Sequence, residues 1–168
     1  MSKAFTRESD DAPESPEWTR QPSPLPPGVK NYITEGGLRR LRAELQKLVD
    51  APPKAATRPA PSLDPQVTAL SEILRTVVLV APPPPPWDQV KFGAKVRVRG
   101  PGGEVREYWI VGVDETDIDR GWVSWLSPIA KALLNARIGQ RVRFRFPSGE
   151  ESLEILEIAY PSNPGTGS

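Results

Sequence analysis

Two residue types that carry much of protein catalysis at neutral pH are missing from this chain. Its 168 residues include neither histidine nor cysteine. Without histidine there is no usual general base near pH 7 and no Ser-His or Cys-His nucleophile arrangement. Without cysteine there is no disulfide framework and no thiolate metal site. We therefore expect a protein that is not an enzyme and has no metal site and no cofactor.

The remaining charged candidates for chemistry lie around residues 50–64. Asp50 and Asp64 bracket a proline-rich stretch whose charged residues are Lys54 and Arg58, both basic. A hard cation needs several carboxylate oxygens, and two nearby cations would repel it. We interpret Asp64 as a helix cap and Asp50 as a solvated helix end. The four residues then mark the tip of a hairpin rather than a metal centre.

The elements that hold this tip are two amphipathic segments. Thr34 can cap the first, over residues 34–49, and Asp64-Pro65 is a typical start for the second. Apolar residues at 3-4-3 spacing place one apolar face on each helix. These are Leu38, Leu41, Leu45 and Leu48 in the first helix and Val67, Leu70, Leu74 and Val77 in the second. The matching faces predict an antiparallel helical hairpin, a short coiled coil, over residues 30–81.

The segments around this hairpin are rich in proline or polar residues. Residues 1–29 are acidic and Pro-rich with little to bury, so we expect a disordered tail. Five prolines in a row, residues 82–86, favour stiff polyproline II, and residues 82–90 are expected to form a linker. The polar residues 162–168 read as a second tail.

From residue 91 onward the apolar pattern becomes that of strands. Val96 and Val98 alternate with basic residues, and the stretch 140–146 alternates in the same way. A Gly-rich turn at 100–103 favours a hairpin with the following apolar run.

One short helix is expected among these strands. Ser127-Pro128 is a favourable helix start, and the residues that follow carry an apolar face. A short strand, 121–125, precedes it. We predict the α+β class, with an antiparallel sheet curled over one packed helix in a domain that spans residues 91–161.

Six sequence motifs lie along the hairpin and the sheet region. They are Asn31–Leu38 (NYITEGGL), Leu41–Leu45 (LRAEL), Val90–Val96 (VKFGAKV), Ile110–Glu115 (IVGVDE), Gly121–Trp125 (GWVSW) and Ser127–Leu134 (SPIAKALL). In this order they resemble the GreA/GreB family of bacterial transcript-cleavage factors, its GreB branch most closely. The resemblance covers nearly all of 31–50 and 90–160. It implies an FKBP-like C-terminal domain at the rim of the secondary channel of RNA polymerase, and a helical arm that enters that channel.

The chain departs from the family pattern at the tip of the arm. The family carries an acidic pair there, which helps the polymerase to hold its second magnesium ion, whereas residues 51–63 contain no acid. A helix of about 15 residues rises only about 22 Å, less than the family's arm. The resemblance therefore implies a regulator of transcription elongation that binds RNA polymerase, competes with other channel-binding factors and does not stimulate cleavage.

The resemblance also implies a polymerase-contacting segment. In the family this is the loop before the Ser-Pro helix, where an Asp often precedes the Ser, and here that position is Leu126. An apolar contact thus replaces a charged one. The candidate binding residues are Leu126, Ser127, Pro128, Ile129 and Lys131.

Composition bounds the location and the partners. No apolar run approaches the roughly 20 residues that span a bilayer, and the N-terminus lacks the apolar core of a secretory signal. A net charge of +1 gives no reason to expect strong non-specific binding to nucleic acid. We expect a cytoplasmic monomer with no membrane and no small-molecule substrate, and the family resemblance implies RNA polymerase as its partner.

Two alternatives stay open. An FKBP-like fold also suits an isomerase or a peptide- or protein-binding module with another partner, since fold alone does not fix function. The alternating arginines at 95–99 and 141–145 suggest weak nucleic-acid binding, although such alternation is usual on the solvated face of a sheet.

Overall fold

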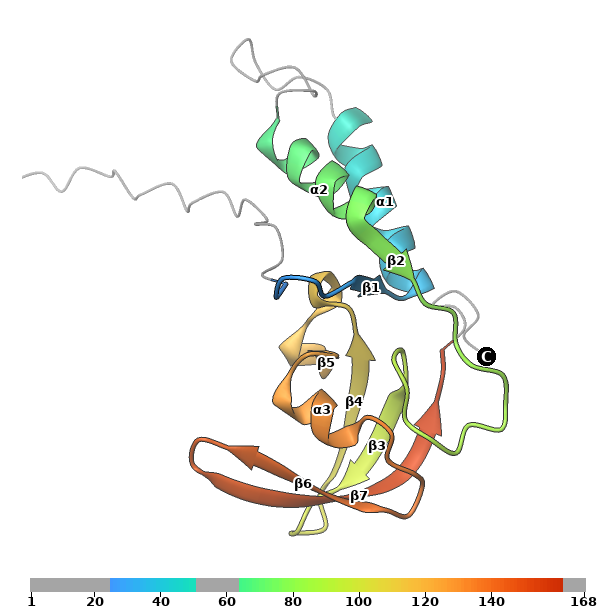
Figure 1. The fold of residues 1–168 in the computed structure, drawn as a ribbon, viewed down its shortest axis with the longest axis vertical. Helices are drawn as coiled ribbons and strands as arrows, with labels where there is room; N and C mark the ends of the chain where they lie inside the picture. The colour runs from blue at the N-terminus through green and yellow to red at the C-terminus, as the bar shows by residue number, and fades with distance from the viewer. Residues whose placement is uncertain (1–24, 51–63, 162–168) are drawn as a thin grey trace, which may run out of the picture.

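The computed structural model describes residues 25–50 and 64–161, so the predicted hairpin tip and most of both tails lie outside the described residues. A helical arm projects from a curled sheet (Figure 1). The elements are β1 (Asn31–Ile33), α1 (Glu35–Asp50), α2 (Pro65–Thr76), β2 (Val77–Leu79), β3 (Lys95–Arg99), β4 (Val105–Val111), the 3-10 turns η2 (Val113–Glu115) and η3 (Ile118–Arg120), β5 (Trp122–Ser124), α3 (Pro128–Leu133), β6 (Arg141–Phe146) and β7 (Gly149–Ala159). Within the described ranges, no helix is both long and apolar enough to cross a membrane.

The arm is the predicted helical hairpin of α1 and α2. Its apolar faces meet in a small cluster formed by Ile33, Leu41, Leu70 and Ile73. Thr34 caps α1 as predicted, because its Oγ1 accepts a hydrogen bond from the Gly37 N–H (3.1 Å). Helix α2 ends at Thr76, and the β-branched residues that follow continue as a strand.

A two-stranded parallel ribbon closes the base of the arm, and the sequence pattern did not predict it. Strand β1 pairs with β2 in the register Asn31↔Val77 to Ile33↔Leu79. The ribbon joins the start of α1 to the end of α2, as Figure 1 shows at the foot of the arm. Because each strand has only three residues, neither carries a readable two-residue period.

The body is a five-stranded sheet in the order β5-β4-β3-β7-β6. Its neighbouring strands are antiparallel except for β4 and β5, which run parallel, so the sheet is mixed. The predicted hairpin β3–β4 is present, and β6 and β7 form a second antiparallel hairpin. The chain passes from β4 to β5 through η2 and η3 rather than through a tight turn, which accounts for the parallel pair.

Alternation divides the sheet into a buried face and a charged face. Val96, Val98 and Leu133 of α3 are almost fully buried in the body core. On the other face Lys95 Nζ lies 2.8 Å from Glu107 Oε1, and Arg97 Nη1 lies 2.9 Å from a Glu157 carboxylate oxygen. The packed helix and the alternating face both follow the predicted pattern.

The stretch expected to be a linker is fastened to the body. Val90 is fully buried in the body core. The Trp87 ring packs 5.6 Å from the Tyr160 ring. The Tyr160 hydroxyl accepts a hydrogen bond from the Lys91 N–H (2.9 Å) and donates one to the Gln89 carbonyl (2.8 Å). The second half of the stretch therefore holds the end of the arm close to the sheet.

Candidate functional site

The described residues nearest the tip of the arm are the two carboxylates. Asp50 is exposed at the end of α1, where Gln46 Nε2 donates to its Oδ2 (2.8 Å). Asp64 caps α2, because its Oδ1 accepts from the Gln66 N–H (2.8 Å), and the cap prediction is confirmed. Lys54 and Arg58 lie outside the described residues. Among the residues that the structure does describe, no group of three or more potential ligands gathers to hold a metal ion.

The predicted contact segment runs from the residues that follow β5 into α3. Ser127 caps α3, since its Oγ accepts from the Ala130 N–H (3.3 Å) and donates to the Ser124 carbonyl (2.6 Å). Pro128 and Lys131 are exposed and Leu126 is half-buried, so these side chains form the surface.

The remaining residue of that segment belongs to the interior. Ile129 is 8% exposed and packs in the body core. Its side chain therefore anchors α3 and supports the contact surface from beneath.

A buried carboxylate joins the arm to the body. The side chain of Glu115, in η2, is only 1% exposed. It accepts hydrogen bonds from the backbone N–H of Thr34 (3.0 Å) and of Gly112 (2.7 Å), from the Thr34 hydroxyl, and from Arg40 Nη2 (3.4 Å). A buried charge is tolerated only when it is paired and hydrogen-bonded, and these donors meet that need. We call this arrangement the joint.

Two glycines let the backbone approach the joint closely. A Cβ added to Gly37 would overlap Glu115 Oε1, and one added to Gly112 would overlap the Tyr32 carbonyl oxygen. Glu115 has little freedom to move away, because four hydrogen bonds hold it. A glycine at each position is therefore a steric requirement of the joint.

Arg40 carries the contact from α1 toward the sheet. Its guanidinium pairs with Glu115 and lies 4.7 Å from the centroid of the Trp122 ring. Partial burial lowers the pKa of Arg40, an effect that Glu115 opposes and Arg120 reinforces. Arg40 therefore binds to a buried carboxylate on one element and to an aromatic ring on another.

Aromatic rings add an apolar contact between the arm and the body. The Tyr32 ring centroid lies 5.1 Å from that of Trp125 and 5.9 Å from that of Phe92. Beside them, Asn31 Nδ2 donates to Asp114 Oδ2 (3.0 Å). The joint thus combines a buried charge network with tilted and edge-to-face aromatic packing.

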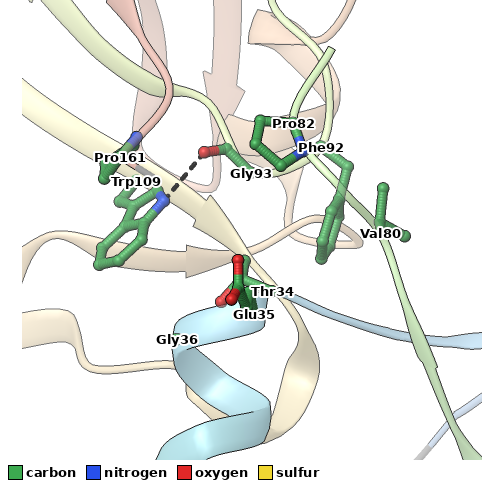
Figure 2. Close-up of a pocket in the computed structure, with 9 residues that line it drawn as sticks. All are labelled: Thr34, Glu35, Gly36, Val80, Pro82, Phe92, Gly93, Trp109 and Pro161. Atoms are coloured by element: carbon green, nitrogen blue, oxygen red, sulfur yellow. Dashed lines mark hydrogen bonds between the residues drawn. The ribbon is translucent and has the colours of Figure 1, made fainter. Parts of the chain in front are cut away.

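A small hollow lies where the start of α1 meets the body (Figure 2). It has a volume of about 20 Å³, which is room for roughly one water molecule. The Trp109 indole N–H donates to the Gly93 carbonyl (3.0 Å) at its edge. The lining residues are Thr34, Glu35, Gly36, Val80, Pro82, Phe92, Gly93, Trp109 and Pro161. We read the hollow as part of a structural joint, because a small-molecule substrate would not fit.

Comparison with known proteins identifies the family. A family-wide sequence model described as "Transcription elongation factor, GreA/GreB, C-term" matches residues 84–160. The "Transcription elongation factor GreB" of Neisseria meningitidis serogroup B is 32% identical over 155 residues, which cover 79% of this chain and 95% of that protein. The chain belongs to the GreA/GreB family. The GreB of Pseudomonas aeruginosa is also 32% identical, over 79% of this chain and 92% of its own length.

A solved structure is similar in a looser way. The "Prokaryotic transcription elongation factor GreA/GreB from Nitrosomonas europaea" is 22% identical, covers 79% of this chain and superposes with a TM-score of 0.42. The family assignment rests on the sequence matches.

The joint is the part of this GreA/GreB chain that sequence reasoning missed. Thr34 and Gly37 belong to the motif at 31–38, and Gly112 and Glu115 belong to the motif at 110–115. Both motifs supported the family resemblance, but nothing linked one to the other. The one available signal was the Gly36-Gly37 pair at the start of a helix, since glycine is unfavourable there unless something packs against it.

Proposed function

We propose that this protein binds RNA polymerase at its secondary channel and regulates transcription elongation there without stimulating transcript cleavage. The observation that carries the proposal is a GreA/GreB chain whose arm has no acid between residues 51 and 63. On this account the protein is a binding factor and not an enzyme.

The length of the arm supports the loss of cleavage stimulation. Helix α1 has 16 residues and α2 has 12, which correspond to about 24 Å and about 18 Å of rise. The family resemblance implies a longer arm with acids at its tip. Metal-assisted hydrolysis needs carboxylate oxygens around the second ion, and the bases Lys54 and Arg58 supply none.

The contact segment supports docking through protein surfaces. Leu126 is half-buried beside the exposed Pro128 and Lys131, so an apolar side chain stands where the family often has a charge. Burial of apolar area is only weakly screened by salt, whereas contacts between exposed charges are strongly screened. We therefore expect polymerase binding to survive moderate ionic strength.

The arginines of the sheet favour this function over nucleic-acid binding. Arg97 pairs with Glu157 (2.9 Å), and Arg145 Nε lies 3.1 Å from a Glu150 carboxylate oxygen. Nucleic-acid binding needs a field of clustered, uncompensated positive charge. Here, acidic residues on neighbouring strands pair with the arginines, so their positive charge is compensated.

Binding to core RNA polymerase tests the proposal, with an active GreB factor as the competitor. We expect the protein to be retained by immobilised polymerase and to be displaced by the active factor. Leu126→Ser should weaken retention, whereas Ile138→Ser, at an exposed position between α3 and β6, should not. If the wild-type protein is not retained, or if an active factor binds alongside it without displacement, the channel proposal fails.

A further inference from the structure

Among the described residues, one large apolar side chain is much more exposed to solvent than the others. Ile118, in η3, is 88% exposed, whereas the next most exposed large hydrophobic residue, Val105, is 54% exposed. Asp117 precedes it and Asp119 follows it. Isolated apolar residues at a surface are common, so exposure alone does not assign a role to Ile118.

The backbone around Ile118 is firmly held. The N–H of Asp117 donates to the Trp122 carbonyl (3.0 Å), and the N–H of Trp122 donates back to the Asp117 carbonyl (2.8 Å). The Gly121 N–H donates to the Ile118 carbonyl (3.0 Å). Gly121 has a φ of +75°, and a Cβ there would lie 2.5 Å from the Glu107 carbonyl oxygen. The turn therefore presents Ile118 in a fixed position, which lowers the ordering cost of any contact it makes.

The turn lies on the shoulder where the arm leaves the body. Arg120 of the turn lies 5.2 Å from the Trp122 ring centroid, and Arg40 of α1 lies 4.7 Å from the same ring. The positive charge of Arg120 also acts on Arg40. A partner that encloses the arm down to its base would meet this shoulder.

A hollow beside the turn completes the surface. It has a volume of about 270 Å³ and is lined in part by Lys95, Trp109, Arg120 and Trp122. The Trp109 and Trp122 rings meet edge to face, with centroids 4.9 Å apart. Tryptophan and arginine are enriched among the residues that dominate binding energy at protein interfaces. An exposed Ile118 beside a hollow lined by tryptophan and arginine therefore resembles the energetically dominant part of a protein interface.

We infer that this shoulder surface, formed by Ile118, Arg120 and Trp122 with the largely buried Trp109 lining the hollow beside them, is a second docking surface for RNA polymerase, distinct from the segment 126–131. This inference rests on the proposed function. The matching polymerase surface is an apolar recess for Ile118 next to a side chain that enters the tryptophan-lined hollow. Arg120 pairs with Asp117 (3.4 Å), so its positive charge is partly compensated within the turn, and we expect the contact to be apolar rather than steered by charge.

The affinity of full-length variants for core RNA polymerase tests the inference. We expect Ile118→Ser to raise the Kd about tenfold or more, because it removes an apolar side chain that becomes buried on binding. Ile138→Ser is the matched control, since Ile138 is also exposed (51%) but lies between α3 and β6, and its Kd should stay within about twofold of wild type. Both variants should keep the wild-type unfolding midpoint, because neither side chain is buried.

A photo-crosslinking amino acid gives a second readout that does not depend on affinity. Placed at position 118 it should crosslink to polymerase, and placed at position 138 it should not. If wild type binds polymerase but Ile118→Ser binds equally well and position 118 does not crosslink, the shoulder inference is overturned while the proposed function stands. If wild type does not bind polymerase at all, both fall together.

Discussion

The body and the arm of this GreA/GreB chain are stabilised in different ways. In the described part of the chain the body core holds fourteen buried residues, whereas the cluster in the arm holds four. Part of the arm's remaining stability comes from its base, where the Glu115 network and the β1–β2 ribbon tie it to the body. The body is thus specified by apolar burial, and the direction of the arm by a joint in which a buried carboxylate network is added to aromatic contacts.

This difference has a functional meaning. On the proposed function, the protein inserts its arm into a channel and must therefore hold that arm at a defined angle to the surface that docks outside. The four buried residues of the arm fix the two helices to each other but not to the sheet. Glu115, Gly37 and Arg40 supply that second constraint, so changes there should affect arm orientation more than overall folding.

The largest expected loss of stability follows from a substitution in the core of the body. Ile110→Ala removes a fully buried side chain from β4 and should lower the free energy of unfolding by about 3 kcal/mol. Urea denaturation followed by tryptophan fluorescence measures this. Val105→Ala, in the same strand but 54% exposed, should change stability by less than about 0.5 kcal/mol. Equal losses for the two would contradict the assignment of the core face.

The next largest effect should lie at the joint. Glu115→Gln keeps the shape of the side chain but replaces one of its two acceptor oxygens by a donor. One oxygen accepts from the Thr34 and Gly112 amides and the other from the Thr34 hydroxyl and Arg40, so two of the four donors lose their acceptor. We expect a loss of about 2 kcal/mol. Hydrogen exchange should quicken at the Thr34 and Gly112 amides while the β6–β7 amides keep their protection. Glu107→Gln, on the exposed face, is the control. Unchanged exchange at both amides together with unchanged stability would refute the joint.

At Gly37, replacement of glycine by alanine should have the opposite effect on stability from the one usual in helices. In most helices Gly→Ala stabilises by about 0.5–1 kcal/mol, but here the new Cβ overlaps Glu115. We expect Gly37→Ala to destabilise by about 1.5 kcal/mol. Its effect should change sign when Glu115 is also replaced by Ala, which a double-mutant cycle measures. An additive cycle would show that the two residues do not constrain each other.

A smaller effect is expected at the helix cap of the contact segment. Ser127→Ala removes the acceptor for the Ala130 N–H and should lower stability by about 1 kcal/mol. Thermal unfolding measures it, and the exposed Ser148→Ala serves as the control. Because the change loosens the start of α3, polymerase binding should weaken somewhat more than stability alone explains. A loss of stability no larger than that of Ser148→Ala would show that Ser127 does not stabilise α3 as a cap.

Sequence patterns predicted the parts of the fold that repeat. Leucines at 3-4-3 spacing predicted the hairpin, and alternation around Val96 and Val98 predicted the sheet. Both are local signals, because each apolar residue has its counterpart within a few positions. The Ser127-Pro128 helix start was predicted for the same reason.

The parts that were missed depend on contacts far apart in the chain. Strands β1 and β2 have three residues each, and their pairing gives no periodic pattern. Glu115 reads in the sequence as one of two acids in a polar turn, and its partner Thr34 lies 81 residues away. The shoulder was missed for the same reason, because Arg40 and Trp122 are far apart in the sequence and meet only in the folded chain.

Transcript cleavage by a backtracked polymerase complex tests the central claim most directly. Added alone, the protein should leave the rate of RNA cleavage at the intrinsic level of the polymerase. Added in excess with an active GreB factor, it should lower the stimulated rate, because on the proposed function both occupy the same channel. Cleavage above the intrinsic level with this protein alone would contradict the account, since an arm without acids at residues 51–63 would then be competent.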